Sequence, residues 1–217
     1  MSNFYHKTEF KFSNAAVSWI LSRYQHRYNA IFFHDLDITQ SDPKSQSDWH
    51  TSLPGRELRS FLSGYNCDTS YYGINVFLSN TRELVRGNPH IDAKFSNGDI
   101  FKIKSRFNVM VLGNPEDNMV WWDTMLWGDE RLIDHPFTTI TGKSYVSKAI
   151  PGTTPDERWE FLGKPTEEAT DLLTPSAFVR TDCAHTIYTS GQPRLIVTVA
   201  LDKTLEEILS SLISYNK

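Results

Sequence analysis

Cysteine is scarce in this chain. Its 217 residues include only two, Cys67 and Cys183. Two cysteines are too few for a disulfide framework, and their spacing fits no zinc knuckle. We therefore expect a protein of the cytoplasm, where thiols stay reduced.

Long apolar runs are also missing. No stretch approaches eighteen uncharged apolar residues, and residues 1–9 carry charged side chains where a secretory leader would need an apolar run. The sequence therefore predicts no membrane segment and no standard export leader.

Basic clusters are absent as well, since no lysine or arginine run is longer than a pair. The net charge is -4 and the isoelectric point is near 6.0. Proteins that bind the phosphate backbone concentrate positive charge, so nucleic acid is an unlikely partner. A small-molecule substrate fits this surface better, and the oligomeric state stays open.

Aromatic residues, by contrast, are plentiful: six Trp, nine Tyr and thirteen Phe make up 13% of the chain. With 39% hydrophobic residues this is the composition of a globular protein, and the aromatics favour β-rich packing. The length suits one well-buried core, so we expect a single domain over residues 1–217.

Periodicity and turn residues predict a β-rich α+β fold with helices near both ends. The expected helices are 13–28, 54–65 and 204–215, with a short one at 156–163. The expected strands are 30–34, 72–78, 89–95, 100–112, 119–122, 144–150, 177–181, 185–188 and 194–201. Many short strands with turn signals, Asn97-Gly98 foremost, indicate a sandwich or antiparallel roll. The proline-containing segment 123–175 is expected to be an irregular insertion over one face of the roll.

The first candidate site is Pro89-His90-Ile91-Asp92. Residues two apart on a strand point to the same side, so His90 and Asp92 can share a metal ion. About one such His-x-acid pair is expected by chance in a chain with seven histidines. The pair therefore carries weight only together with other residues.

Those other residues lie near the end of the chain. His185 precedes Arg194 by nine positions, with a Ser190-Gly191 turn signal between them. Because Arg194 opens a strongly β-forming run, a strand, a turn and a return strand should bring His185 and Arg194 side by side. Two histidines and one carboxylate form a face that holds Fe(II) and leaves three positions open. His50 and Arg59 have the same spacing, but Arg59 falls in a predicted helix.

In these residues the chain resembles the Fe(II)/2-oxoglutarate-dependent dioxygenase superfamily, whose pattern is H-x-D, a distal histidine and an arginine about ten residues later. The resemblance implies a double-stranded β-helix, or jelly roll, over about residues 71–201. It further implies that His90, Asp92 and His185 bind Fe(II) and that Arg194 pairs with the far carboxylate of 2-oxoglutarate, with O2 as the second cosubstrate.

One position departs from that pattern. The family often has Ser or Thr two residues after the arginine, and here that residue is Ile196. Thr198 is the next hydroxyl on the same face, and Tyr72 or its neighbour Tyr71 is a second candidate to help hold the cosubstrate.

Further candidates come from predicted strands. Arg106 would grip 2-oxoglutarate or a substrate carboxylate, with a solvent-facing charge as the alternative. Asn108 shares its face and, with Trp122, is a candidate substrate contact, although core packing is the better explanation for a tryptophan.

The sequence thus predicts a metal-binding oxidoreductase, an iron dioxygenase that hydroxylates a C–H bond of a small metabolite. A free amino acid or derivative is the expected substrate, with release of succinate and CO2. The alternatives are a cupin-like metal protein or 2-oxoglutarate-independent metalloenzyme, a hydroxylase of protein side chains, and a structural roll without catalysis.

Two other constellations are weaker. Cys183 and His185 could form a nucleophile pair, but no oxyanion-type glycine turn accompanies them, and a buried Cys is the simpler interpretation. His34, Asp35 and Asp37 could form a second metal site.

Overall fold

The structure is a computed structural model. It describes residues 2–24, 34–37, 49–67, 71–79, 84–96, 99–113, 117–138, 144–169, 175–190 and 194–215. Among these residues no helix is long and apolar enough to cross a membrane.

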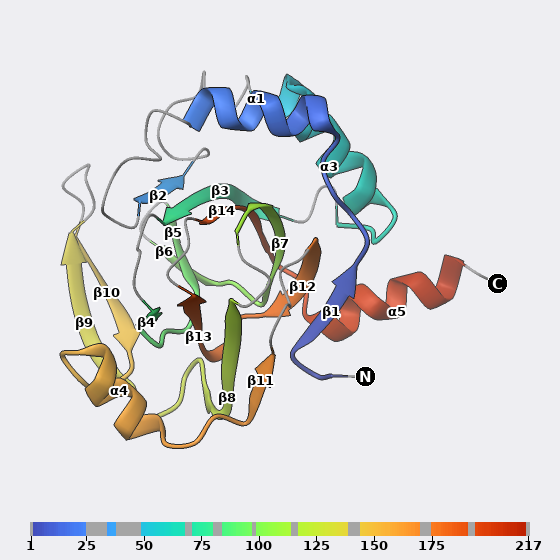
Figure 1. Cartoon of the computed structure of the whole chain (residues 1–217). Helices are drawn as coiled ribbons and strands as arrows, with labels where there is room; N and C mark the ends of the chain where they lie inside the picture. The colour runs from blue at the N-terminus through green and yellow to red at the C-terminus, as the bar shows by residue number, and fades with distance from the viewer. Residues whose placement is uncertain are drawn as a thin grey trace.

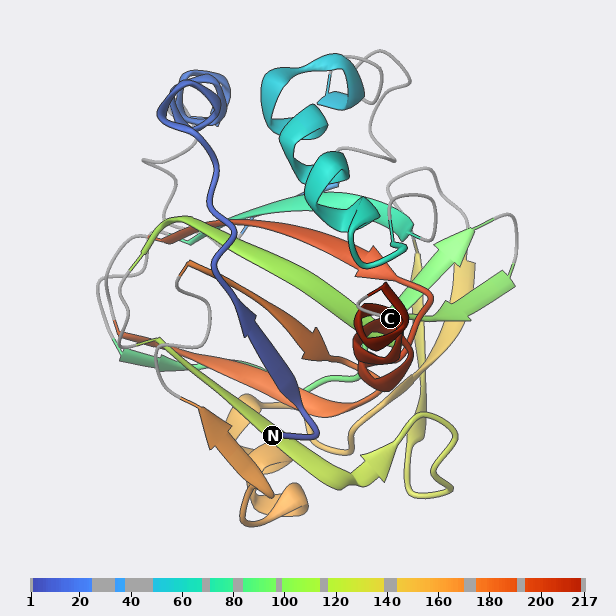
Figure 2. The same ribbon diagram turned by 90° about the vertical axis from the view of Figure 1, so that its right-hand side faces the viewer.

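Two antiparallel sheets form the body of the molecule (Figures 1 and 2). The six-stranded sheet has the order β1-β12-β7-β14-β3-β2, and the four-stranded sheet has the order β11-β8-β13-β4. The strands of the first are β1 (Tyr5–Thr8), β2 (His34–Asp37), β3 (Tyr71–Ser79), β7 (Ser105–Leu112), β12 (Ser176–Arg180) and β14 (Arg194–Leu201). Those of the second are β4 (Leu84–Arg86), β8 (Asn118–Leu126), β11 (Glu167–Ala169) and β13 (Cys183–Ser190).

Eight of these strands wind back and forth between the two sheets. Along the chain, β3, β7, β12 and β14 join the six-stranded sheet, and β4, β8, β11 and β13 join the four-stranded sheet. Two facing sheets built by such crossing are a jelly roll. The double-stranded β-helix expected from the sequence is therefore confirmed, and its strands run from Tyr71 to Leu201.

Helices cover the outer faces of the roll. α1 (Asn14–Tyr24) and α3 (Leu53–Ser63) lie over the six-stranded sheet (Figure 2). Their apolar side chains, such as Ile20 and Leu58, share one buried cluster with Phe107 and Val197 of that sheet. α5 (Leu205–Tyr215) adds Leu205 and Ile208 to the same cluster. The three long helices predicted from periodicity are confirmed within the described residues; residues 25–28 of the first lie outside them.

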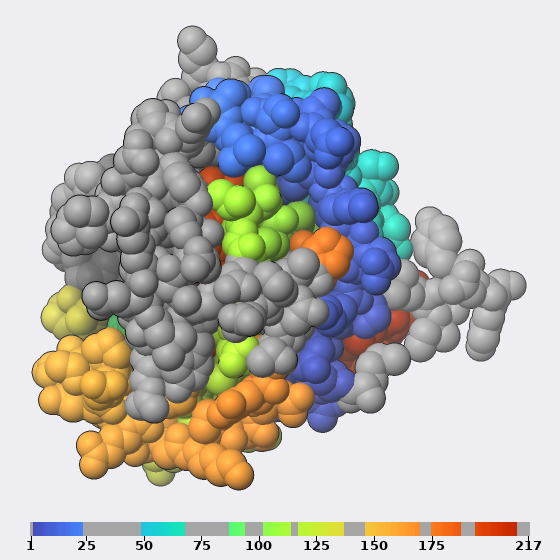
Figure 3. All heavy atoms as spheres, in the orientation of Figure 1, coloured from blue at the N-terminus to red at the C-terminus, as the bar shows by residue number. Residues whose placement is uncertain are grey.

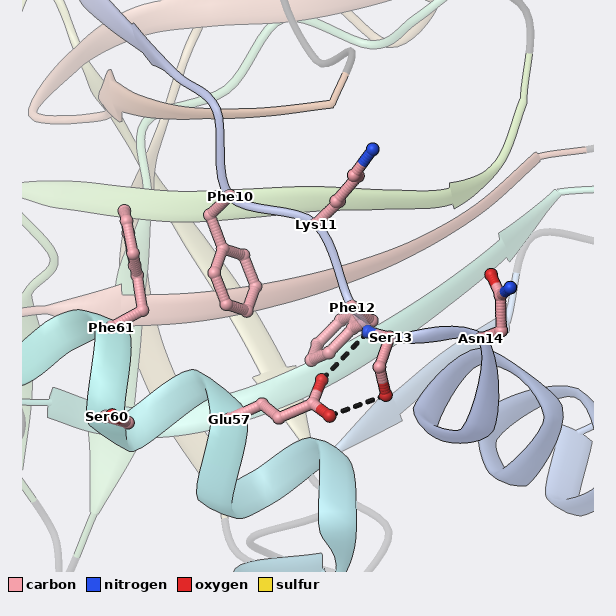
Figure 4. Close-up of a pocket in the computed structure, with 8 residues that line it drawn as sticks. All are labelled: Phe10, Lys11, Phe12, Ser13, Asn14, Glu57, Ser60 and Phe61. Atoms are coloured by element: carbon pink, nitrogen blue, oxygen red, sulfur yellow. Dashed lines mark hydrogen bonds between the residues drawn. The ribbon is translucent and has the colours of Figure 1, made fainter.

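The beginning of α1 is held by α3. Glu57 accepts hydrogen bonds from the backbone N–H of Ser13 (3.0 Å) and from its hydroxyl (2.6 Å) (Figure 4). The Ser13 hydroxyl in turn accepts from the N–H of Ala16. A hollow of about 730 Å³ lies beside this contact. Glu57, the carboxylate in its lining, is already engaged in capping α1. We therefore do not interpret the hollow as a binding site.

Side chains of β8 alternate between two cores. Trp121 points into the roll, where it packs with Phe4 and Ile196. Trp122 points outward and packs with Trp159 of α4 (Pro155–Leu162). The two tryptophans face opposite ways because successive residues of a strand point to opposite faces.

The segment 123–175 is more regular than predicted. β8 continues to Leu126, and β9 (Ile133–Thr138), β10 (Ser144–Ala149), α4 and β11 follow, with β9 and β10 paired. The expected helix at 156–163 is confirmed as α4. The prolines that suggested irregularity lie partly in these elements: Pro136 within β9 and Pro155 at the first position of α4, where no backbone donor is needed.

Two predicted strands are interrupted. The stretch 89–95 contains only a single bridge at His90 before β5 (Ala93–Ser96), and 100–112 divides into β6 (Asp99–Lys102) and β7. β5 and β6 pair through Ser96 and Asp99, although the Asn97-Gly98 turn itself lies outside the described residues. The predicted strand 30–34 overlaps β2 (His34–Asp37) only at His34, because residues 30–33 lie outside the described residues.

Candidate metal centre

His90, Asp92 and His185 meet in the structure although the last two lie 93 positions apart in the sequence. Their candidate ligand atoms all lie within 4.8 Å of one another. His90 and His185 form a backbone bridge, with each N–H donating to the other's carbonyl at 3.0 Å. The N–H of Asp92 donates to the carbonyl of Thr181 at 3.2 Å. The backbone therefore brings the three residues together independently of any ligand.

Both imidazoles are oriented by backbone carbonyls. Nδ1 of His90 lies 2.8 Å from the carbonyl oxygen of Asn88, and Nδ1 of His185 lies 2.9 Å from that of Cys183. A proton on each Nδ1 leaves the Nε2 of the neutral ring free to bind a metal, and a protonated His90 donates through its Nε2 to Asp92. The Nε2 atoms of His90 and His185 lie 3.5 Å and 3.9 Å from oxygens of Asp92. Such outer hydrogen bonds are typical of metal-binding histidines.

Arg106 supports the carboxylate. Its Nε donates to Oδ2 of Asp92, and both side chains are largely buried. Burial alone would raise the pKa of Asp92, but the charge of Arg106 and the hydrogen bond from His90 hold that pKa well below its usual range. Asp92 is therefore a carboxylate at neutral pH, as a metal ligand must be.

The two histidines differ in their tendency to bind a proton. Desolvation lowers the pKa of His185 to about 4, with the charge of His90 acting in the same direction. Desolvation acts on His90 too, but hydrogen bonding and attraction to Asp92 outweigh it and raise the pKa of His90. His185 is therefore neutral at pH 7 and available to a metal.

The triad opens onto a cavity of about 120 Å³ inside the roll. The cavity is lined by polar and apolar side chains from both sheets: His90, Asp92, Arg106, Asn108, Thr181, His185, Arg194 and Thr198, with Met119, Val179, Ile187 and Ile196. Figure 3 shows the molecule from the viewpoint of Figure 1, with part of β7 visible below α1.

Arg194 lines the same cavity and is only 2% exposed. Its Nη1 lies 3.5 Å from Oδ2 of Asp117 and makes no hydrogen bond within the described part of the chain. Thr198 is 1% exposed, and its hydroxyl also lacks a hydrogen-bond partner there. Buried polar groups are nearly always hydrogen-bonded, so this pair is typical of a ligand site.

The route by which His185 and Arg194 meet was predicted wrongly. β13 and β14 are not a hairpin: β13 pairs with β4 and β8, whereas β14 pairs with β3 and β7. The chain therefore passes from one sheet to the other between Ser190 and Arg194. The two side chains therefore approach across the interior of the roll, and not along a shared ladder.

Some of the other predicted residues line the cavity, and others have side chains outside the described part of the structure. Asn108 and Thr198 line the cavity, and Ile196 lies between Thr198 and Arg194 on the same face. Tyr72 belongs to β3, but its side chain lies outside the described residues, as do those of His34, Asp35 and Asp37.

Trp122 is not a cavity residue, and its prediction as a substrate contact is wrong. Its ring is 1% exposed and packs outside the roll, with its indole N–H donating to the carbonyl of Gly163 at 2.9 Å. Cys183 is fully buried, and burial raises the pKa of its thiol to about 12. A nucleophilic role would need the thiolate, so the Cys183–His185 pair is not a nucleophile pair.

Sequence reasoning missed Asp117, Thr181 and Asn88. Asp117 precedes β8 and Asn88 precedes the His90 motif, and neither belongs to a periodic pattern. Thr181 ends the predicted strand 177–181, where period two would have placed it on the face of Val179. That alternation was the one available signal.

No protein-family model matches the sequence, and no curated protein sequence matches it. Several solved structures are distantly similar. One is the non-haem α-ketoglutarate-dependent carbocyclase SnoK from nogalamycin biosynthesis, at TM-score 0.49 and 10% identity over 91% of this chain and 79% of that one.

Two others are similar at the same level. The epimerase SnoN, in complex with Fe3+, α-ketoglutarate and nogalamycin RO, has TM-score 0.47 and 16% identity over 88% of this chain and 76% of that one. HygX from Streptomyces hygroscopicus, with iron bound, has TM-score 0.45 and 10% identity over 91% and 81%. The fold assignment rests on the strand order described above and not on these distant similarities. In its jelly-roll fold and in its His-Asp-His cluster, the chain resembles the Fe(II)/2-oxoglutarate-dependent dioxygenases.

Proposed function

We propose that the protein is a non-haem Fe(II)/2-oxoglutarate-dependent oxygenase that acts on a small metabolite. The observation that carries this proposal is the placement of His90, Asp92, His185 and Arg194 around one cavity. A metal site and a buried cation in the lining of one small space suit a ligand that chelates the metal and ends in a carboxylate.

The donor set fits Fe(II). Two imidazole nitrogens and one carboxylate are the ligands of the facial triad that non-haem iron oxygenases use. Both imidazoles are oriented by carbonyls, and the second oxygen of Asp92 is occupied by Arg106, which favours binding through one oxygen only. Three positions are then left for other ligands.

Arg194 and Thr198 in the cavity lining fit a carboxylate. The Nη1 of Arg194 lacks a hydrogen bond among the described residues. The hydroxyl of Thr198 also lacks one there. A carboxylate of 2-oxoglutarate would accept from both, which offsets the desolvation of each group. Thr198 would thus take the place of the hydroxyl that Ile196 does not supply.

When bound together, Fe(II), 2-oxoglutarate and O2 supply the oxidation of a C–H bond, one oxygen atom entering succinate and the other the product as CO2 leaves. The chain's own residues hold and orient these groups. Met119, Val179, Ile187 and Ile196 give the cavity apolar walls that limit water near the metal. Asn108 is the polar wall residue that we assign to the substrate side.

For the substrate we propose a free amino acid or a derivative, with hydroxylation as the outcome. This rests on the small cavity and on the acidic net charge, since neither suits a flipped nucleobase. A protein side chain is the alternative substrate.

The test is succinate release from 2-oxoglutarate by the purified chain with Fe(II), followed by a screen of amino acids for stimulated release and of the products for a gain of one oxygen. His90→Ala and Asp92→Asn should abolish release, whereas His135→Ala, on the exposed β9, should not. Undiminished release in the triad variants, with folding intact, would overturn the proposal.

One observation favours a second candidate, a metalloenzyme of the same fold that does not use 2-oxoglutarate. Asp117 already offsets the charge of Arg194 at 3.5 Å. The two candidates differ in ligand binding: tight binding of 2-oxoglutarate to the metal-loaded protein, lost in Arg194→Ala, excludes the second one.

A further inference from the structure

We propose that α4 positions His90, through Arg158 and Trp159 acting on residues 87–90, here called the ligand segment. The inference rests on the proposed function, since it assigns a role toward the same metal. It gives the connection between β8 and β12 a role at the metal site.

His90 is the triad member that most needs such support. Its side chain is 53% exposed, compared with 9% for Asp92 and 4% for His185. His185 lies within β13, whereas His90 belongs to no strand and has only a single bridge. The orientation of the His90 ring therefore depends on the ligand segment around it.

Arg158 reaches this ring through one intermediate residue. Its Nη1 donates to Oδ1 of Asn88 at 2.9 Å, and the backbone carbonyl of Asn88 lies 2.8 Å from Nδ1 of His90. The Nε of Arg158 donates to the carbonyl of Gly152 at 3.0 Å, which fixes the guanidinium. Because the carbonyl of Asn88 sets which ring nitrogen faces the metal, a shift of Asn88 would turn the ligand.

Trp159 holds the beginning of the ligand segment. Its indole N–H donates to the carbonyl of Gly87 at 3.2 Å, and its ring packs edge-on against Trp122 with centroids 4.8 Å apart. On the other side, Gly87 touches β13 so closely that a Cβ would lie 2.3 Å from Oγ1 of Thr186. Gly87 at the beginning of the segment is thus held between α4 and the strand that carries His185.

The ends of α4 are themselves fixed. Thr154 and Glu157 form a capping box at its start, and Gly163 ends it with a positive φ of 69°. Both features define where the helix begins and ends. The positions of Arg158 and Trp159 are therefore set by local sequence and not by a ligand.

The experiment measures the affinity of the metal-free full-length chain for Co2+, by competition with a chelator, and the visible spectrum of the Co2+ complex. Arg158→Ala should weaken binding about 10-fold or more and shift the Co2+ bands, as the loss of an outer partner of a metal ligand does. Arg158→Lys keeps one donor for Asn88, so its Co2+ affinity should lie between those of the unaltered chain and Arg158→Ala. Arg131→Ala removes another arginine of the same connection, one that bonds Asp129, and should bind like the unaltered chain.

The outcomes separate the inference from the proposed function. If the unaltered chain binds no Co2+, the proposed function fails and the inference fails with it. If the chain binds Co2+ and Arg158→Ala has the same affinity and spectrum, the inference alone is overturned. Should Arg158→Ala not fold, Trp159→Phe keeps the packing but removes the donor to Gly87, and unchanged Co2+ affinity in that variant overturns the inference equally.

Discussion

Arg194 and Asp117 face each other with side chains that are 2% and 1% exposed. A buried ion pair is not a source of stability by itself, because the desolvation of two charges opposes their attraction. Here the pair places a guanidinium at one side of the cavity and keeps it charged without a ligand. The residue is therefore prepared for a carboxylate before one binds.

If Arg194 binds the carboxylate in this way, replacing it should weaken the binding of 2-oxoglutarate and leave metal binding unchanged. Arg194→Lys should weaken 2-oxoglutarate binding roughly 10- to 100-fold, because lysine cannot offer two parallel donors. Metal affinity should not change. Calorimetric titration of the Mn2+-loaded protein measures the first quantity, and metal titration measures the second. Thr198→Val should have a smaller effect, and equal losses of metal and 2-oxoglutarate binding would contradict the assigned role.

Cys183 illustrates the opposite case, a reactive side chain made inert by its position. It is fully buried and burial raises its pKa to about 12. Thiolates, not thiols, react with alkylating agents. In the native protein Cys183 should therefore resist iodoacetamide at pH 8 and become modified after denaturation, as mass spectrometry of the peptide can show. Rapid native modification would mean that the thiol is accessible.

At the scale of elements, local sequence predicted strands far better than their partners. Period two placed Arg194, Ile196 and Thr198 on one face of β14, and all three line the cavity. The partner of β13 depends on contacts with β8 and β4, which lie far away in sequence. No turn signal distinguishes a hairpin from a crossing between sheets, so the Ser190-Gly191 signal led to the wrong pairing.

Helix boundaries were predictable where capping residues mark them, as at Ser13 and Thr204. The contact between α1 and α3 was not predictable from the sequence, because Ser13 and Glu57 belong to two separate helical patterns. It gives an element-scale prediction: Glu57→Ala should lower the free energy of unfolding by roughly 0.5 to 1 kcal/mol, the usual effect of losing a helix-capping contact. Urea denaturation measures this, with the exposed Glu160→Ala as the control. Equal midpoints for the two variants would show that the contact contributes nothing.

At the scale of the whole molecule, the crossing of the chain between two sheets explains how distant residues form one site. His90 lies after β4, His185 in β13 and Arg194 at the start of β14. The sequence motif predicted that these residues meet, but only the three-dimensional strand order shows that they do so inside the roll. The burial that results has a consequence for folding stability.

That consequence is a dependence on pH. His185 has a folded-state pKa of about 4, compared with 6.5 for an unperturbed histidine. Between these values the unfolded chain binds a proton that the folded chain does not, so the stability of the metal-free protein falls as pH decreases from 6.5 to 4. The raised pKa of His90 acts with the opposite sign, since its contribution is lost as pH rises through the folded-state value.

We therefore expect His185→Gln to flatten the acid side of the stability curve, removing up to about 3 kcal/mol of pH-dependent change. Denaturation at several pH values in the presence of a chelator measures the difference between the two proteins. His135→Gln, at an exposed histidine, should leave the curve unchanged. Parallel curves for the unaltered chain and His185→Gln between pH 4 and 6.5 would mean that His185 is not held neutral by burial in the fold.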